Sequence, residues 1–131
     1  MKLSIIGSGY VGLVTGECLA NVEKNVTCID INEKKINKLR NGIIPIYEPG
    51  LEDLIKEKVA SSTLTFSSNI SETVKNTDVI FIAVGTPTNK ENNSADLSQV
   101  FSCAEEIAKN IKNNTIVILK STVPVGTCDK V

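Results

Sequence analysis

Short apolar runs alternate along the chain with segments whose apolar residues recur every three or four positions. The runs are rich in β-branched residues, which is typical of buried parallel strands, and the recurring positions are typical of helices. We predict strands at Leu3–Ile6, Val26–Ile31, Leu64–Phe66, Asp78–Val84 and Thr115–Leu119. We predict helices at Val11–Val22, Glu33–Leu39, Leu51–Val59, Ser71–Lys75 and Asp96–Ile111. Strands that alternate with helices predict an α/β fold with a doubly wound parallel sheet.

Several local features refine this prediction. The run Asp78–Val84 is the most apolar and belongs in the middle of the sheet. Ser71 is placed to cap its short helix, and Pro124 is placed to begin a helix after the last strand. Residues 43–51 and 85–94 are rich in proline, glycine and polar residues, so we expect loops there. For the first helix we expect a buried apolar side made of Val11, Leu13, Val14, Cys18, Leu19 and Val22.

Length and charge limit the possible functions. The chain has 131 residues, which fits one domain and leaves no room for a separate substrate domain. Its 14 Lys and Arg residues against 15 Asp and Glu residues give a net charge of -1, with no basic block, so nucleic acid and anionic membranes are poor partners. The N-terminal apolar run is too short for a signal peptide, and no run is long enough to span a bilayer. We therefore expect a cytoplasmic protein.

The cysteines and the lack of histidine exclude other chemistry. The four cysteines show neither C-x-x-C spacing nor the density of a disulfide scaffold, and the chain contains no histidine. We therefore expect no metal site and no histidine-dependent triad. Cys18 and Cys28 are expected to be buried as small hydrophobic residues. Cys128 falls near a predicted helix start but has no accompanying base, so it is a poor candidate nucleophile.

A glycine-rich turn is the main candidate for ligand binding. Gly7-Ser8-Gly9-Tyr10-Val11-Gly12 matches the pattern G-x-G-x-x-G between the first predicted strand and the first predicted helix. Gly7 permits a tight turn, Gly9 lets the backbone approach a pyrophosphate, and Gly12 lets the helix lie close to the strand. The helix N-terminus then offers free N–H groups and a positive dipole end to the phosphates. The alternative is a glycine-rich turn without a ligand.

Asp30 supports the same interpretation. It lies 18 residues after Gly12 at the end of the second predicted strand, close to the spacing expected for the carboxylate that accepts hydrogen bonds from an adenosine ribose. A carboxylate there repels a 2′-phosphate and favours NAD over NADP, while the nearby Lys35 softens that preference by supplying a cation. A solvated acid at a strand end and a solvated helix lysine are the alternatives.

Two more candidate loops follow strands at the carboxyl edge of the sheet, where open α/β folds bind ligands. Val84, Gly85, Thr86 and Pro87 follow the most apolar strand, and their backbone is placed to line the cofactor. Ser121 and Thr122 follow the last strand, and the Thr122 hydroxyl is a candidate to hold a water or a polar substrate group. From composition alone, a plain turn is favoured over a ligand-binding loop at both places.

Together these residues resemble the UDP-glucose 6-dehydrogenases, within the wider group of nucleotide-sugar dehydrogenases. The resemblance rests on five blocks that cover the whole chain in order. They are Gly7 to Gly12, Asp30 with Lys35, Tyr47-Glu48-Pro49-Gly50-Leu51, Val84-Gly85-Thr86-Pro87, and Lys120-Ser121-Thr122-Val123-Pro124-Val125-Gly126-Thr127. The last two blocks are more similar to the UDP-glucose branch than to its relatives.

The resemblance implies a Rossmann-type NAD-binding domain of an enzyme that oxidises the sugar C6 alcohol to a carboxylate. Two hydride transfers to two NAD molecules pass through a thioester-type intermediate on a cysteine. The glycine-rich block, Asp30, Lys35, Thr86 and Thr122 match positions that contact NAD or its surroundings. Thr122 also matches the threonine that helps to position a catalytic water.

In this family the nucleophilic cysteine, its lysine and asparagine neighbours and most UDP-sugar contacts lie beyond residue 131, and Cys128 does not match the nucleophile. We therefore expect residues 1–131 to be the N-terminal part of a longer, homo-oligomeric enzyme, inactive alone because the substrate-binding domain is absent. Two alternatives remain. The parent is a dehydrogenase of another nucleotide sugar, such as GDP-mannose or UDP-N-acetylmannosamine, or the chain is a non-catalytic module that binds NAD.

Overall fold

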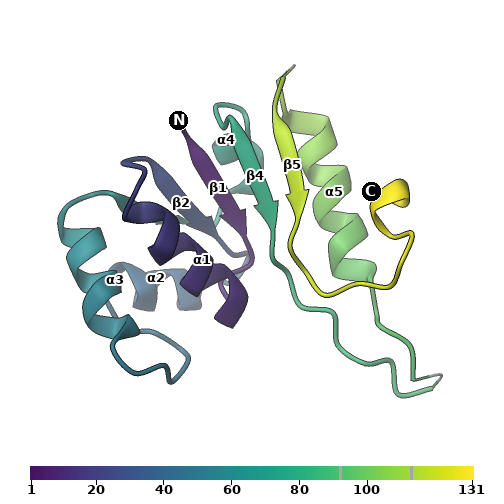
Figure 1. The fold of residues 1–131 in the computed structure, drawn as a ribbon, viewed down its shortest axis with the longest axis horizontal. Helices are drawn as coiled ribbons and strands as arrows, with labels where there is room; N and C mark the ends of the chain where they lie inside the picture. Colours follow the sequence, from purple (N-terminus) through teal and green to yellow (C-terminus); the bar gives the residue numbers. More distant parts are fainter. Residues whose placement is uncertain (92, 113) are drawn as a thin grey trace.

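The computed structural model describes residues 1–91, 93–112 and 114–131. Within these residues five parallel strands form one sheet in the order β3-β2-β1-β4-β5 (Figure 1). The strands are β1 (Leu3–Ile6), β2 (Val26–Ile29), β3 (Leu64–Ser67), β4 (Val79–Ile82) and β5 (Ile116–Leu119). The helices are α1 (Tyr10–Ala20), α2 (Glu33–Arg40), α3 (Leu51–Ala60), α4 (Ile70–Val74), α5 (Ser98–Asn110) and the 3-10 helix η1 (Cys128–Lys130). The predicted parallel α/β sheet is confirmed.

The strand order places a topological switch point at the carboxyl end of β1. The chain moves outward from β1 through β2 to β3, then returns to pair β4 with the other side of β1. Ile5 in β1 therefore lies opposite both Cys28 in β2 and Phe81 in β4. A crevice forms where connections leave neighbouring strands in opposite directions, and ligands of open α/β sheets bind in that crevice.

Helices cover both faces of the sheet and create two cores. Alternate residues of each strand point to opposite faces, so Ile5 packs with α1, α2 and α3, whereas Ile6 packs with α4 and α5. Figure 1 shows α1, α2 and α3 together beside one half of the sheet and α5 beside β5. As predicted, β4 is an internal strand, because β1 and β5 flank it.

The buried side of α1 differs from the prediction. The buried residues of α1 are Gly12, Leu13, Gly16, Glu17 and Ala20, so a stripe of small residues replaces most of the predicted apolar side where the helix meets the sheet. A Cβ added at Gly16 would lie 2.4 Å from the Cys28 Sγ, so only a glycine permits this close approach. Val11, Cys18 and Val22 of the predicted side are exposed, whereas Leu13 is buried and Val14 and Leu19 pack at its margin.

Two smaller predictions were also wrong. Asn69, and not Ser71, caps α4, because the Asn69 side chain accepts a hydrogen bond from the backbone N–H of Glu72 at 3.0 Å. Ser71 instead donates a hydrogen bond to the Glu106 carboxylate of α5. Pro124 begins a turn, in which the N–H and the hydroxyl of Thr127 both donate to its carbonyl oxygen, and the 3-10 helix η1 starts only at Cys128.

Asn92, which falls in the predicted loop 85–94, lies outside the described residues. In the part of the chain that the structure describes, no helix has the length and the apolar character needed to cross a membrane.

Candidate functional site

The glycine-rich turn joins β1 to the N-terminus of α1 and has the geometry expected from the motif. Gly7 has φ +105°, a value that side chains rarely allow, and a Cβ there would lie 2.4 Å from the carbonyl oxygen of Ala83. A Cβ at Gly12 would lie 1.7 Å from the Gly7 carbonyl oxygen. Both glycines are therefore required by the fold itself.

Gly9 differs from these two glycines. It is the N-cap residue of α1, and a Cβ at this position would meet no described atom within 4 Å. The fold therefore does not require glycine there, but the open space in front of the helix N-terminus does suit a ligand that approaches the backbone. The first N–H groups of a helix lack partners within it and favour an anion such as a pyrophosphate.

Asp30 directly follows β2, and Ser8 of the glycine-rich turn holds its carboxylate. The Asp30 Oδ2 accepts hydrogen bonds from the Ser8 hydroxyl at 2.6 Å, the Ser8 backbone N–H at 3.2 Å and the Lys35 Nζ at 2.8 Å. The Asp30 Oδ1 accepts from the backbone N–H of Asn32 at 3.0 Å. Partial burial by itself raises the pKa of Asp30, but the hydrogen bonds from Lys35, Ser8 and Asn32 outweigh it and leave the pKa below its ordinary value.

Hydrogen bonds also tie together the two loops that follow β4 and β5. The Thr86 hydroxyl donates to the carbonyl oxygen of Thr122 at 2.8 Å, and the Ser121 hydroxyl donates to the carbonyl oxygen of Val84 at 2.7 Å. The backbone of the Thr122 loop is thereby fixed, while the Thr122 side chain remains exposed. The two loops form one wall at the carboxyl edge of the sheet.

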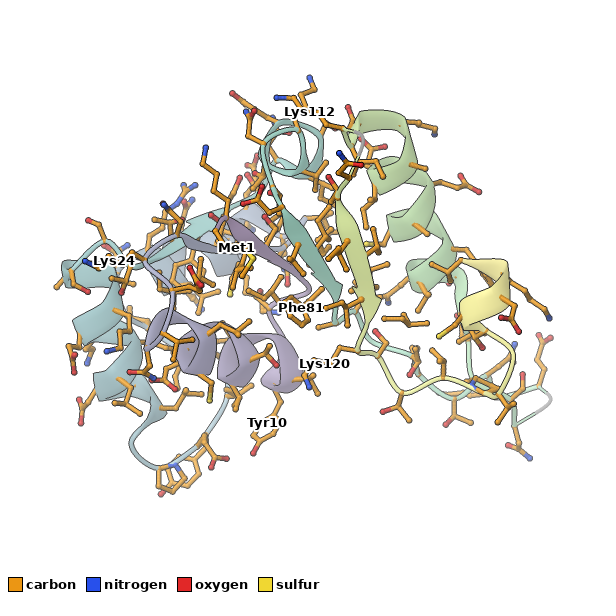
Figure 2. All side chains as sticks on the ribbon, turned by 45° about the horizontal axis from the view of Figure 1, so that its top comes forward. Met1, Tyr10, Lys24, Phe81, Lys112 and Lys120 are labelled. Carbon is orange, nitrogen blue, oxygen red and sulfur yellow. The ribbon has the colours of Figure 1, made fainter. Side chains whose placement is uncertain are left out.

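One cavity of about 880 Å³ brings most of the predicted site residues together at this edge. Its lining includes Gly7, Ser8, Gly9, Tyr10, Val11, Asp30, Lys35, Val84, Gly85, Thr86, Ser121 and Thr122. Gly12 and Pro87 are not part of the lining: Gly12 is buried against Gly7, and Pro87 is exposed beside the cavity. Figure 2 shows Tyr10 and Lys120 near this edge and Lys112 at the opposite end of the molecule.

Sequence reasoning missed one wall of the cavity. This wall comes from α5, from two residues that follow β2 and from the first residue of α4. Its members are Ile31, Asn32, Ile70, Ser98, Gln99, Ser102 and Cys103. The α5 members form two adjacent pairs that lie four residues apart, which places them on one side of a helix. That spacing was visible in the sequence, but only the strand order shows that this side of α5 faces the glycine-rich turn.

Tyr10 connects the cavity to the loop before α3. Its phenol interacts with the carboxylate of Glu48, and the hydrogen bond and the negative charge of Glu48 raise the pKa of Tyr10 above its ordinary value. The phenol is therefore neutral at physiological pH and can serve as a hydrogen-bond donor. Glu48 belongs to the block Tyr47 to Leu51, so the structure brings this block next to the glycine-rich turn.

The cysteines do not supply a nucleophile to the cavity. Cys103 lines it, but burial raises the pKa of its thiol to about 12. Cys28 is buried as predicted, and burial raises its pKa to about 12 as well. Cys18 was predicted to be buried and is exposed, because α1 turns its glycine stripe toward the sheet. Cys128 is exposed in η1 and is not part of the cavity lining.

Comparison with known proteins identifies close relatives. Residues 1–131 match the profile described as "UDP-glucose/GDP-mannose dehydrogenase family, NAD binding domain". A UDP-glucose 6-dehydrogenase of Rhizobium meliloti (strain 1021) is 50% identical over 131 residues, which are 100% of this chain and 30% of the relative.

Solved structures agree with the sequence comparison. A UDP-glucose dehydrogenase from Pyrobaculum islandicum superposes with a TM-score of 0.89 at 40% identity, over 96% of this chain and 30% of that protein. A GDP-mannose dehydrogenase from Pseudomonas aeruginosa, solved as a ternary complex, gives a TM-score of 0.92 at 36% identity, over 100% of this chain and 30% of that protein. The chain thus spans about 30% of the length of these relatives.

Proposed function

The chain belongs to the UDP-glucose/GDP-mannose dehydrogenase family and matches its NAD-binding domain. We therefore propose that it is the NAD-binding part of an oxidoreductase that converts UDP-glucose to UDP-glucuronate with two NAD molecules. The observation that carries the choice of sugar is the degree of identity. Two UDP-glucose dehydrogenases are 50% and 40% identical to this chain, compared with 36% for the GDP-mannose dehydrogenase. When NAD is bound, it accepts the hydride from the sugar.

The residues that line the cavity suit NAD. The N-terminus of α1 and the open space at Gly9 accommodate the pyrophosphate. The Asp30 carboxylate, held in the ionised form by its hydrogen bonds, accepts from the ribose hydroxyls. The wall formed by Val84, Gly85 and Thr86 flanks the cofactor from the side of β4. Gly12 acts by holding α1 close to the turn, and Pro87 contributes no lining.

Thr122 has a separate proposed role. The hydrogen bond from Thr86 to its carbonyl oxygen fixes its backbone at the cavity, and its hydroxyl both donates and accepts hydrogen bonds. Such a hydroxyl orients a water for the hydrolysis of an acyl intermediate without changing its own protonation state. Ser121 acts beside it as an anchor, because its hydroxyl is bonded to the Val84 carbonyl oxygen.

A substrate assay tests this function. The complete gene product that contains these residues should form NADH with UDP-glucose, measured by NADH absorbance, faster than with GDP-mannose or UDP-N-acetylmannosamine. Residues 1–131 alone should form none, because no described residue set here combines a reactive thiol with an acid or base partner. Preference for another nucleotide sugar would overturn the choice of UDP-glucose.

GDP-mannose and UDP-N-acetylmannosamine are the alternative substrates, because a GDP-mannose dehydrogenase and a UDP-N-acetylmannosamine dehydrogenase both superpose on this chain with a TM-score of 0.92. The same assay distinguishes the three sugars. A non-catalytic role would instead show as NAD binding by the complete gene product without NADH formation from any of the three sugars. Gel filtration with light scattering of that product tests the further proposal that it is a homo-oligomer.

A further inference from the structure

Lys35 is a partly buried cation whose charge one carboxylate neutralises. Its Nζ lies 2.8 Å from the Asp30 Oδ2, and the two side chains are 24% and 16% exposed. Ion pairs that are shielded from solvent in this way are screened less by salt than surface pairs. Lys35 also lines the cavity beside the glycine-rich turn, so an ammonium group lies next to the acid that faces the ribose.

The position of Lys35 is fixed from both ends. The Asn32 side chain caps α2 by accepting a hydrogen bond from the Lys35 backbone N–H at 3.1 Å, so the first turn of α2 is anchored. The Asp30 carboxylate holds the other end, and Ser8 in turn holds Asp30. The Ser8 hydroxyl is fully buried and donates to the same Oδ2 that Lys35 contacts.

We propose that Lys35 is able to bind a phosphate on the 2′ oxygen of the adenosine ribose, and that its ion pair with Asp30 prevents this binding. A 2′-phosphate needs a cation and is repelled by a carboxylate, and here one pair of residues contains both groups. Selectivity for NAD over NADP then depends on Asp30 in two ways. The carboxylate repels the phosphate, and it also forms an ion pair with the Lys35 ammonium group that would otherwise bind the phosphate.

Ser8 acts as a positioning residue in this arrangement. Its hydroxyl and its backbone N–H both donate to the Asp30 Oδ2. These bonds hold the carboxylate in place, so that the Asp30–Lys35 ion pair does not move aside when a phosphate approaches. Replacement by alanine removes the 2.6 Å hydroxyl bond and leaves the backbone bond. The inference therefore assigns Ser8 an effect on cofactor selectivity as well as on packing. It rests on NAD binding by this domain, and not on the identity of the sugar.

Titration calorimetry with NAD and NADP on residues 1–131 tests the proposal. Asp30→Asn keeps the shape, keeps an acceptor for the Asn32 N–H and removes the negative charge. We expect the ratio of NADP to NAD affinity to rise roughly tenfold, the size expected for a hydrogen bond to a charged group. Adding Lys35→Met should abolish this gain. Adding Lys34→Met, which removes the neighbouring exposed lysine of α2, should not.

Two outcomes overturn the proposal: an unchanged affinity ratio in a folded Asp30→Asn protein, or a gain that survives Lys35→Met. If Asp30→Asn does not fold, Lys35→Met alone decides. It leaves the carboxylate without its cation, so discrimination against NADP should increase, and an unchanged or reduced discrimination contradicts the inference. Ser8→Ala should reduce discrimination. No sugar nucleotide is present in these titrations, so failure of the UDP-glucose assignment would leave their results unchanged.

Discussion

The Thr86 hydroxyl donates a hydrogen bond to the carbonyl oxygen of Thr122 across 36 residues of sequence, at a distance of 2.8 Å. This bond joins the loop after β4 to the loop after β5, and the bond from Ser121 to the Val84 carbonyl oxygen joins them a second time. The two loops therefore move as one wall of the cavity. The contribution of each loop to ligand binding depends on the other.

The first prediction separates two glycines of the same motif. Gly9→Val should weaken NAD binding by at least about tenfold and leave the fold intact, because a Cβ there meets no described atom within 4 Å and obstructs only the ligand. Gly12→Ala should instead lower the free energy of unfolding by about 1 to 3 kcal/mol or more, since its Cβ would overlap the Gly7 carbonyl oxygen.

Calorimetry with NAD and urea unfolding of both variants measure the two effects. Gly50→Ala does not serve as a control, because Gly50 has φ +82°. Gly85→Ala is a control for the unfolding measurement alone, since its Cβ would make only an ordinary contact, 3.8 Å from the Gln99 Oε1, whereas Gly85 itself lines the cavity. A strongly destabilised Gly9→Val protein, or equal heats of NAD binding to it and to the wild type, would contradict the assignment of the pyrophosphate to this turn.

The second prediction concerns the contact between α1 and β2. Gly16→Ala should destabilise the domain by about 1 to 3 kcal/mol, because the new Cβ would lie 2.4 Å from the Cys28 Sγ. Cys28→Ala removes that sulfur, so the double variant should be more stable than the sum of the two single changes predicts. A coupling of about 0.5 to 3 kcal/mol in urea unfolding is expected for residues in contact. If the effects of the two substitutions simply add, α1 must instead move away from β2 to make room for the new Cβ.

This contact also shows why the sequence predicted the helix but not its orientation. The three- and four-residue spacing of Val11, Val14, Cys18 and Val22 correctly indicates a helix, and side-chain size then suggests the wrong buried side. Where a helix lies directly on a sheet, the closest positions need the smallest residues. The glycine at position 12 was interpreted in this way, but Gly16, one turn later, was not.

The candidate site was predictable as far as local motifs reach. Asp30 and the glycine-rich turn could be paired from their spacing because β1 and β2 are adjacent in the sequence and in the sheet. Ser102 and Gln99 could not be assigned to the site in this way. Their place at the cavity depends on the return of the chain to β4 and on which side of α5 faces the cavity. The hydrogen bond from Ser8 to Asp30 likewise requires coordinates, because no sequence pattern reports a hydroxyl direction.

The third prediction concerns pH. The pKa of Asp30 lies below its ordinary value of 3.8 in the folded protein, so the unfolded chain binds a proton at this residue more readily than the folded chain does. The ionised carboxylate therefore stabilises the fold above pH 3.8, and this contribution is lost as the pH falls through the lower, folded value. Wild type and Asp30→Asn should differ in the free energy of unfolding at neutral pH and converge at acid pH. A difference that grows as the pH falls would contradict this sign.

The last prediction concerns Thr122 in the complete enzyme. If its hydroxyl orients the hydrolytic water, Thr122→Val should slow hydrolysis of the acyl intermediate more than it weakens NAD binding, because valine keeps the shape and loses the donor and acceptor. An acyl-enzyme should then accumulate, visible as added mass on the enzyme by mass spectrometry. Thr122→Ser restores the hydroxyl and should recover most of the turnover.

Thr86→Val is the matched comparison for Thr122→Val, since it removes the hydrogen bond that holds the Thr122 carbonyl oxygen and leaves the Thr122 hydroxyl in place. We expect an intermediate loss of turnover that Thr86→Ser recovers, because serine restores the donor. A Thr122→Val enzyme with full turnover and no trapped acyl-enzyme would reduce Thr122 to a structural part of the loop. Loss of NAD affinity equal to the loss of hydrolysis would show that the two threonines shape the cofactor cavity, and that neither directs the water.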